Sequence, residues 1–205
     1  LPKPPLRIEC FDNSHIQGSE LVSSLVVFID GKPRKSEYRK FKIKTVDYND
    51  DFAAMREVVQ RRYSRVIEEK TQLPDLIVID GGKGQLSTAT EVLKELNIFD
   101  KLIVVGLAKR LDEIFFPNRS DSVLLPKTSS SLKLIQQVRD EAHRFAITFH
   151  RQLRDKRTLS TELTQITGIG EKSAQKLLIK LGSVEKVKNS SYQELKEVVG
   201  EKAAN

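Results

Sequence analysis

Three apolar segments near the N-terminus, separated by turn signals, predict consecutive β-strands. Arg7–Asp12 is rich in β-forming residues, Leu21–Asp30 is a long apolar run with many β-branched residues, and Tyr38–Val46 alternates polar and apolar positions. Asp30-Gly31 is a typical tight-turn pair. We therefore expect these strands to form an antiparallel meander.

The middle of the chain alternates between helical and strand patterns. A helix capped by Asp50 or Asp51 is followed by the strand Leu76–Asp80, a second helix after a glycine-rich turn, and the strand Leu102–Leu107. Short, almost entirely apolar strands are typical of a sheet that is covered on both faces. The pattern predicts an α/β fold with a right-handed crossover between these two strands. Short β segments are expected further along, at Ile114–Phe116 and Val123–Leu125.

The C-terminal part of the chain reads as helical. Apolar residues at three- and four-residue spacing predict a long amphipathic helix from Ser130 to about Leu153. A charged linker is expected near 155–160, and the small residues and glycine turns beyond it predict a small all-α domain. We therefore expect a larger domain over residues 1–155 and a smaller one over residues 156–205.

The composition fits a chain with an apolar core and no membrane segment. Hydrophobic residues make up 39% and charged residues 31% of the 205 residues, and no apolar run reaches the roughly 18 residues of a membrane helix. The first residues, LPKPPLR, lack the apolar core of a secretory signal. A single cysteine, Cys10, excludes an intramolecular disulfide framework and a cysteine-based zinc cluster, so a reducing, cytoplasmic location is expected.

Positive charge is concentrated in one segment. The net charge is +7, and Gly31–Lys44 alone holds seven Lys or Arg residues against one acidic residue, Glu37. A solvated strand face explains such a run in many proteins. Its concentration is also what a surface that follows a chain of phosphates needs.

Two aspartates, Asp12 and Asp80, stand at the ends of predicted apolar strands. If the two strands are neighbours in one sheet, the carboxylates converge, and like charges at that distance demand a cation. Carboxylate oxygens suit Mg²⁺ or Mn²⁺. The alternative is that each aspartate caps the turn that follows its strand.

Two further features could act near these aspartates. The run Gly81–Gly84 lacks the spacing of a phosphate-binding loop, so nucleotide hydrolysis is not expected, but Lys83 could meet a phosphate. On the predicted long helix, His143 lies one turn after Arg139 and near Asp140, where it could reach a metal ion or activate water. The alternative is an ordinary surface histidine.

The predicted small domain carries two related glycine motifs. Gly168-Ile169-Gly170 precedes a helix, and the backbone N–H groups at such a turn form an anion site suited to a nucleic-acid phosphate. The motif is echoed around Gly200. The residues of this domain expected to contact DNA are Gly168, Gly170, Lys172, Ser173, Lys176, Gly200 and Lys202.

Taken together, these motifs resemble a known family. The tail resembles a tandem helix-hairpin-helix. The segments ECFDNSHIQG, DDFAAMREVVQRRY, LPDLIVIDGGKGQL and RDEAHRFAITFHR, in this order, resemble the C-terminal half of the UvrC family, the nuclease component of bacterial nucleotide excision repair. The resemblance covers nearly all of the chain. It implies a ribonuclease H-like endonuclease domain, a mixed sheet with flanking helices, which makes the incision on the 5′ side of a lesion, followed by paired hairpins that bind DNA.

The resemblance also implies roles for individual residues. It makes Asp12 and Asp80 the acidic positions and His143 the catalytic histidine, and we expect these three to hold Mg²⁺ or Mn²⁺ for cutting DNA. It matches Asp51 to a further aspartate that the family needs, although capping a helix beside Asp50 is an equal alternative. The expected DNA contacts outside the hairpins are Arg139 and Lys83.

The partners that this resemblance implies are double-stranded DNA and, through regions absent here, the UvrB component of the excinuclease. The chain resembles a monomeric fragment without the N-terminal nuclease domain of the family, and its second hairpin ends at Asn205 before a closing helix is complete. Two alternatives stay open. One is a DNA-binding module on the same scaffold without activity, and the other is a nuclease directed at RNA or at DNA junctions.

Overall fold

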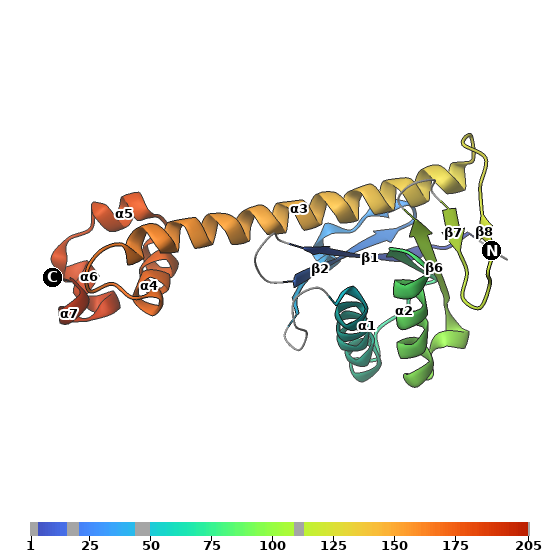
Figure 1. The fold of residues 1–205 in the computed structure, drawn as a ribbon, viewed down its shortest axis with the longest axis horizontal. Helices are drawn as coiled ribbons and strands as arrows, with labels where there is room; N and C mark the ends of the chain where they lie inside the picture. The colour runs from blue at the N-terminus through green and yellow to red at the C-terminus, as the bar shows by residue number, and fades with distance from the viewer. Residues whose placement is uncertain (1–3, 16–20, 44–49, 109–112, 205) are drawn as a thin grey trace. The chain divides into compact units, whose positions relative to one another are not determined.

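The chain forms two compact units, Leu1–Thr148 and Phe149–Asn205 (Figure 1). The computed structural model describes residues 4–15, 21–43, 50–108 and 113–204, without the side chains of residues 14, 15, 21, 150–161, 202 and 204. The first unit contains the sheet, and the second consists of helices.

An eight-stranded mixed sheet lies at the centre of the first unit. Its strands are β1 (Arg7–His15), β2 (Leu21–Ile29), β3 (Lys32–Pro33), β4 (Arg39–Lys42), β5 (Leu76–Asp80), β6 (Ile103–Ala108), β7 (Glu113–Phe115) and β8 (Ser122–Val123). They follow the order β3-β2-β1-β5-β6-β7-β8, and β4 also pairs with β2. β5 pairs in parallel with both β1 and β6. β2 is antiparallel to β1 and to β4.

Helices cover both faces of this sheet. The helices with residues in the first unit are η1 (Lys35–Glu37), α1 (Asp51–Glu68), α2 (Lys83–Glu95), η2 (Phe99–Lys101) and the beginning of α3 (Ser130–Thr164). Figure 1 shows α1 and α2 on one face and α3 on the other. One buried cluster joins α1 to the sheet, for example through Met55 and Phe11. A second cluster joins α3 to the opposite face, for example through Val138 and Cys10.

The predicted meander and the predicted strand–helix–strand unit are both confirmed. β1 lies beside β2, and β2 lies beside β4, in antiparallel pairs. β5 is central, between β1 and β6, and all five of its residues are buried. Because helices cover both faces, the side chains that point to either face of β5 need to be apolar, which explains the unbroken run Leu76–Ile79.

The prediction of a linker near 155–160 is wrong, because these residues are helical: α3 continues through them to Thr164 instead of ending near Leu153. The segment 154–160 contains neither glycine nor proline, and its Arg and Lys residues are good helix formers, so nothing in it breaks the helix. The contacts divide the chain between Thr148 and Phe149, within this helix. The limits 1–155 and 156–205 stay a prediction.

The second unit is the small all-α domain that the sequence predicts. After the last turns of α3 it contains α4 (Glu171–Leu181), α5 (Val184–Lys188), α6 (Tyr192–Val199) and α7 (Glu201–Ala204). Its core consists of Leu163, Ala174, Leu177, Val184 and Val187. Ser191 begins α6 with a capping box, in which the Ser191 hydroxyl and the Glu194 carboxylate each accept from a backbone N–H.

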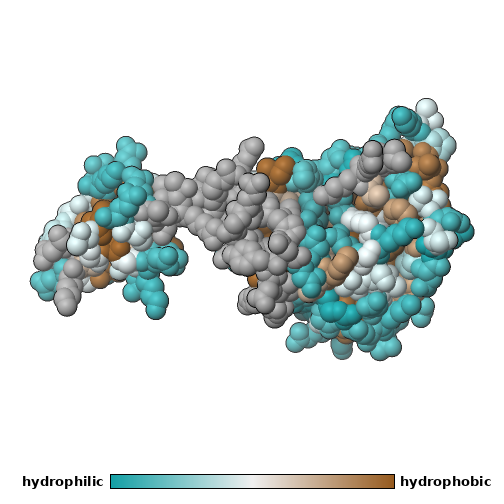
Figure 2. Space-filling model, viewed as in Figure 1, coloured by the Kyte–Doolittle hydropathy of each residue, from teal (hydrophilic) through white to brown (hydrophobic). Residues whose placement is uncertain are grey.

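Among the helices of the described residues, none is both long and apolar enough to cross a lipid bilayer. On the face that Figure 2 shows, hydrophilic residues cover most of the described surface of the first unit, and hydrophobic ones are interspersed among them.

A buried carboxylate, Glu9, ties β1 to α1. Its side chain is fully buried, and its two oxygens accept hydrogen bonds from Arg62 Nη2 at 2.7 Å, Tyr63 Oη at 3.0 Å and Arg7 Nη2 at 3.0 Å. Burial, and then the charge of Glu9, raise the pKa of Tyr63 well above its ordinary value, so the phenol stays protonated and can donate. A fully buried charge of this kind is tolerated because it is paired and hydrogen-bonded.

We predict that Glu9→Gln lowers the free energy of unfolding by about 3–5 kcal/mol, because Arg62 would keep a partly buried charge without its carboxylate. Urea denaturation measures this change. Glu69→Gln is the matched control, since it removes an exposed ion pair with Arg65 and should cost less than about 1 kcal/mol. Equal losses in the two variants would show that the buried network adds little to stability.

Candidate functional site

Two carboxylates lie side by side at the carboxyl end of the central strands. β1 and β5 are parallel, and their register places Asp12 opposite Asp80. Because residues opposite each other in a sheet point to the same face, both carboxylates share the face that α3 covers. The two side chains are buried, with exposed fractions of 0% and 3%.

His143 completes a compact group with this pair. It comes from α3, and its Nδ1 lies 3.4 Å from Asp12 Oδ2. One ligand atom from each of Asp12, Asp80 and His143 lies within 4.8 Å of the others, and we call these three residues the Asp-Asp-His cluster. The helix is held over the sheet there, because Ser24 Oγ donates to the backbone carbonyl of Ala142 at 3.2 Å.

The donor set of this cluster fits a divalent cation. Asp12 Oδ1 is buried and has no hydrogen-bond partner among the described residues. A buried oxygen of this kind needs a partner, and a bound cation would provide one. Two carboxylates are ligands that Mg²⁺ and Mn²⁺ prefer, and an imidazole is a ligand more typical of transition-metal ions. The described side-chain contact of Asp12 is with His143, rather than with a backbone N–H of the turn that it could have capped.

The electrostatic field of the acidic pair reaches its neighbours. Burial first, and then the charges of Asp80 and Asp12, raise the pKa of the Cys10 thiol well above its ordinary value. Arg139 opposes this shift, so its positive charge also lies near the pair. Arg139 forms an ion pair with Asp140 at 3.0 Å, and its side chain is mostly covered.

Asp51 is not part of the Asp-Asp-His cluster. It is the first residue of α1, and the N-cap is its neighbour Asp50, whose carboxylate accepts from the N–H groups of Phe52 and Ala53. The backbone carbonyl of Asp51 accepts a hydrogen bond from Asn13 Nδ2 at 3.2 Å, which ties the start of α1 to the residue after Asp12. Sequence reasoning missed Asn13, although its position beside Asp12 is a signal that could have identified it.

Lys83 begins α2, directly after the glycine turn that follows Asp80. Its ammonium donates to the carbonyl of Ser120 at 2.6 Å and lies 5.1 Å from the centre of the Phe115 ring. Lys83 is exposed, so a phosphate could still approach it.

The hairpin residues surround the start of α4 in the second unit. Gly168 has a φ of +94°, which favours glycine, whereas Gly170 is the N-cap of α4 with a φ of −85°. Lys172 and Lys176 are exposed and Ser173 is half-buried. Of the corresponding positions in the repeat, Gly200 has a φ of +83° at the end of α6, and the side chain of Lys202 lies outside the described residues.

The basic segment of the sequence forms an edge of the sheet. Its described cations, which we call the basic edge, are all exposed: Lys32, Arg34, Lys35, Arg39, Lys40 and Lys42. In the sheet register Lys40 lies opposite Ser24, which lies opposite Asp12. Two strand spacings put Lys40 about 10 Å from Asp12 along the sheet.

Two carboxylates adjoin the basic edge. Each binds an arginine from outside the edge, and Glu37 also forms an ion pair with Arg34 of the edge at 3.9 Å. Glu37 accepts from Arg7 at 2.6 Å, and Glu141 accepts from Arg144 at 2.6 Å. These hydrogen bonds hold the pKa of both carboxyl groups below the ordinary value. The edge therefore keeps an excess of positive charge.

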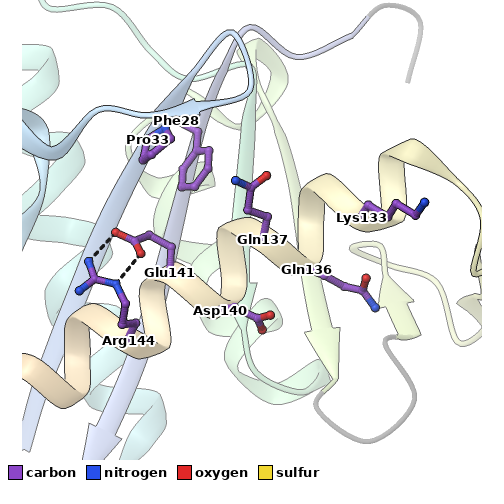
Figure 3. A pocket seen from close by; sticks show the side chains of 8 residues that line it. All are labelled: Phe28, Pro33, Lys133, Gln136, Gln137, Asp140, Glu141 and Arg144. Carbon is purple, nitrogen blue, oxygen red and sulfur yellow. Dashed lines mark hydrogen bonds and ion pairs between the residues drawn. The ribbon is translucent and has the colours of Figure 1, made fainter.

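A shallow groove of about 520 Å³ lies elsewhere on the first unit. The residues that line it are Phe28, Pro33, Lys133, Gln136, Gln137, Asp140, Glu141 and Arg144. Figure 3 shows Glu141 and Arg144 joined to each other at its side. No member of the Asp-Asp-His cluster lines this groove, and its charges are balanced, so it adds no ligand site to the cluster.

Comparison with known proteins gives related sequences over the whole chain. "UvrABC system protein C" of Chlorobium phaeobacteroides is 60% identical over 204 residues, which are 100% of this chain and 32% of that protein. The protein of the same name from Chlorobium chlorochromatii is 62% identical over 203 residues, 99% of this chain and 32% of that protein. The chain thus spans about a third of the length of these curated relatives.

A solved structure of Ciona intestinalis endonuclease V in complex with a 24mer DNA has 17% sequence identity and a TM-score of 0.38. The match covers 67% of this chain and 57% of that one. At this TM-score the likeness supports no argument about function.

Two family models match the chain, one for each part of it. Residues 160–205 match the SAM-like helix-hairpin-helix tandem, which confirms the predicted nature of the C-terminal helices. Residues 1–147 match the UvrC RNAse H endonuclease domain, which confirms both the predicted ribonuclease H-like fold and the family resemblance. Since that match takes in most of its residues, the chain belongs to the family of UvrC RNAse H endonuclease domains.

Proposed function

We propose that this chain is a metal-dependent DNA endonuclease unit that makes the 5′ incision in bacterial nucleotide excision repair. The observation that carries the proposal is the approach of Asp12, Asp80 and His143 to within 4.8 Å of one another on a domain of this family. The proposal includes a cytoplasmic location, Mg²⁺ or Mn²⁺ as the cofactor, and the UvrB component of the excinuclease as a partner of the whole protein. The relatives named UvrABC system protein C support this assignment.

Each residue of the cluster has a distinct part in this proposal. Asp12 and Asp80 bind the metal ion, and the paired strands β1 and β5 keep their carboxylates in a fixed orientation. When bound, the ion lowers the pKa of a water and neutralises charge on the scissile phosphate. His143 is 54% exposed, so its imidazole can both complete the ligand set and exchange a proton with solvent.

Asp51, Arg139 and Lys83 complete the proposed site around this cluster. Asp51 is linked to β1 through Asn13, and Arg139 lies one helical turn before His143. Lys83 stands at the start of a helix, where the helix dipole also favours a phosphate. We assign Arg139 and Lys83 to DNA contacts, and Asp51 to a supporting position outside the metal ligands.

DNA affinity in this proposal comes from contacts that do not read the base sequence. The hairpin glycines expose backbone N–H groups, and Lys172 and Lys176 add positive charge on the surface of α4. The basic edge adds further positive charge to the first unit. Selection of lesions then depends on other proteins.

We predict that Asp12→Asn abolishes nicking of plasmid DNA in Mn²⁺ and leaves duplex affinity within about 1 kcal/mol, because one metal ligand is not the main phosphate contact. Gel electrophoresis of the plasmid and a binding titration measure the two effects. The matched control is Asp50→Asn, which makes the same change beside α1 and keeps a good capping residue.

Equal loss of cutting and of binding in Asp12→Asn would contradict this site. A wild-type chain that binds plasmid and never nicks it would instead identify a DNA-binding module without activity. Faster cleavage of RNA or of branched DNA than of duplex would point to the other class of nuclease.

We predict that Gly170→Leu weakens DNA binding by about 1.5–3 kcal/mol and leaves folding intact. Its φ of −85° is open to any residue and a Cβ there meets no atom within 4 Å, but the side chain would keep a phosphate from the backbone N–H groups. Fluorescence anisotropy with labelled duplex measures the affinity, and thermal unfolding measures the stability. Asn189→Leu, at an exposed helix end, is the control, and equal affinity in both variants would remove the hairpin from the DNA contacts.

A further inference from the structure

Phe52 is an aromatic side chain that the chemistry described above does not use. It is 55% exposed, although it stands in the first turn of α1. The Asp50 carboxylate accepts hydrogen bonds from the N–H groups of Phe52 and Ala53, at 3.0 and 2.9 Å. The ring is therefore presented by a capped helix start, whose backbone is fixed.

A glycine on the neighbouring helix makes room for this ring. A Cβ at Gly84 would lie 2.4 Å from Cε1 and 2.7 Å from Cζ of Phe52, so a larger residue would displace the ring. Glycine in a helix costs about 1 kcal/mol relative to alanine. α2 therefore has a residue of low helix propensity, Gly84, at the point where one edge of the Phe52 ring rests. More than half of Phe52 nevertheless stays exposed to solvent.

Two connections link the Phe52 ring to the strand ends that carry the acidic pair, although α1 covers the opposite face of the sheet from the two carboxylates. Asn13, the residue after Asp12, donates to the carbonyl of Asp51, the residue before Phe52. β4 and β1 are both antiparallel to β2, so these two strands run in the same direction and end on the same side of the sheet. The start of α1 lies on that side, because Asp51 contacts Asn13 near the end of β1. α1 and α2 are bound side by side further along, where Arg56 forms ion pairs with residues of α2.

The second connection is the glycine turn between β5 and α2. Asp80 is followed by Gly81 and Gly82, and Gly82 is the N-cap of α2 without a side-chain cap. A Cβ at Gly82 would meet no atom within 4 Å, so the surface there is open. The Gln85 side chain covers Gly81, and Phe52 itself covers Gly84, so the point at which a ligand can approach the backbone closely is Gly82.

We propose that Phe52 stacks on a nucleobase of the DNA strand that is cut, near the scissile phosphate, and that the open backbone at Gly82 lets the sugar–phosphate backbone pass close to the end of β5. This inference rests on the proposed nuclease function. Every base offers a flat face to an aromatic ring, so such stacking positions a strand without selecting its sequence. A single ring among glycines and polar residues is too small for a stable protein interface.

The absence of tryptophan from the chain gives a direct test. Phe52→Trp in an Asp12→Asn background introduces the only indole into a protein that does not cut its ligand. A duplex oligonucleotide with a short bubble of unpaired bases should quench that fluorescence on binding, because the indole stacks on a base. Leu124→Trp in the same background is the control, since Leu124 is 63% exposed just after the strand β8 at the far edge of the sheet; its indole should not be quenched.

A second pair of variants separates stacking from packing of the two helices. Phe52→Leu keeps an apolar side chain against Gly84 and should weaken binding of the bubble duplex by about 5- to 150-fold, the effect of losing one stacked base. Phe52→Tyr keeps the ring and should bind like the wild type. Thermal unfolding of each variant is the control that tests whether the fold is retained.

Wild-type affinity in Phe52→Leu, or equal quenching of the indoles at positions 52 and 124, would overturn the inference. These readouts do not depend on cutting. If the wild-type chain fails to nick DNA while the indole at position 52 is still selectively quenched, the nuclease proposal fails and the stacking site stands.

Discussion

Two buried carboxylates in register on neighbouring parallel strands are the constraint on which the first unit depends. The register of β1 with β5 sets Asp12 opposite Asp80, about one strand spacing away, and burial prevents water from screening their repulsion. The described surroundings offer Asp12 one imidazole at 3.4 Å and leave its second oxygen without a hydrogen bond. A divalent cation bound by both carboxylates would offset their mutual repulsion, so their register and burial favour a metal site.

β1 also carries a second buried carboxylate, Glu9, which contributes to stability instead of to a binding site. Glu9 and Asp12 are three residues apart on β1, so they point to opposite faces of the sheet. Glu9 faces α1, and Arg7, Arg62 and Tyr63 satisfy its oxygens. Asp12 faces α3, where its described side-chain partner is the imidazole of His143. One carboxylate is therefore neutralised by the fold itself, and the other is available to a ligand.

In the proposed function, the buried part of the protein carries the chemistry and its exposed part binds DNA. The sheet buries and orients the acidic groups, which a reaction at one phosphate requires. The basic edge and the hairpin glycines present charge and N–H groups at the surface, which affinity for a phosphate chain requires. Phe52 differs from both, because it offers an exposed ring held by a capped helix and a glycine, and in the proposed stacking site this ring would position a DNA strand.

Local patterns in the sequence determined most of the secondary structure of this protein. Apolar runs predicted the strands, the three- and four-residue spacing predicted the helices, and four motifs identified the family. The strand ends and these motifs together predicted Asp12, Asp80 and His143 as site residues. The tertiary structure alone decided that β1 pairs with β5, that Asp50 rather than Asp51 caps α1, and that Phe52 rests on Gly84. These outcomes depend on contacts between residues far apart in the chain, or on the choice between neighbours that suit a position equally well, and no local pattern encodes either.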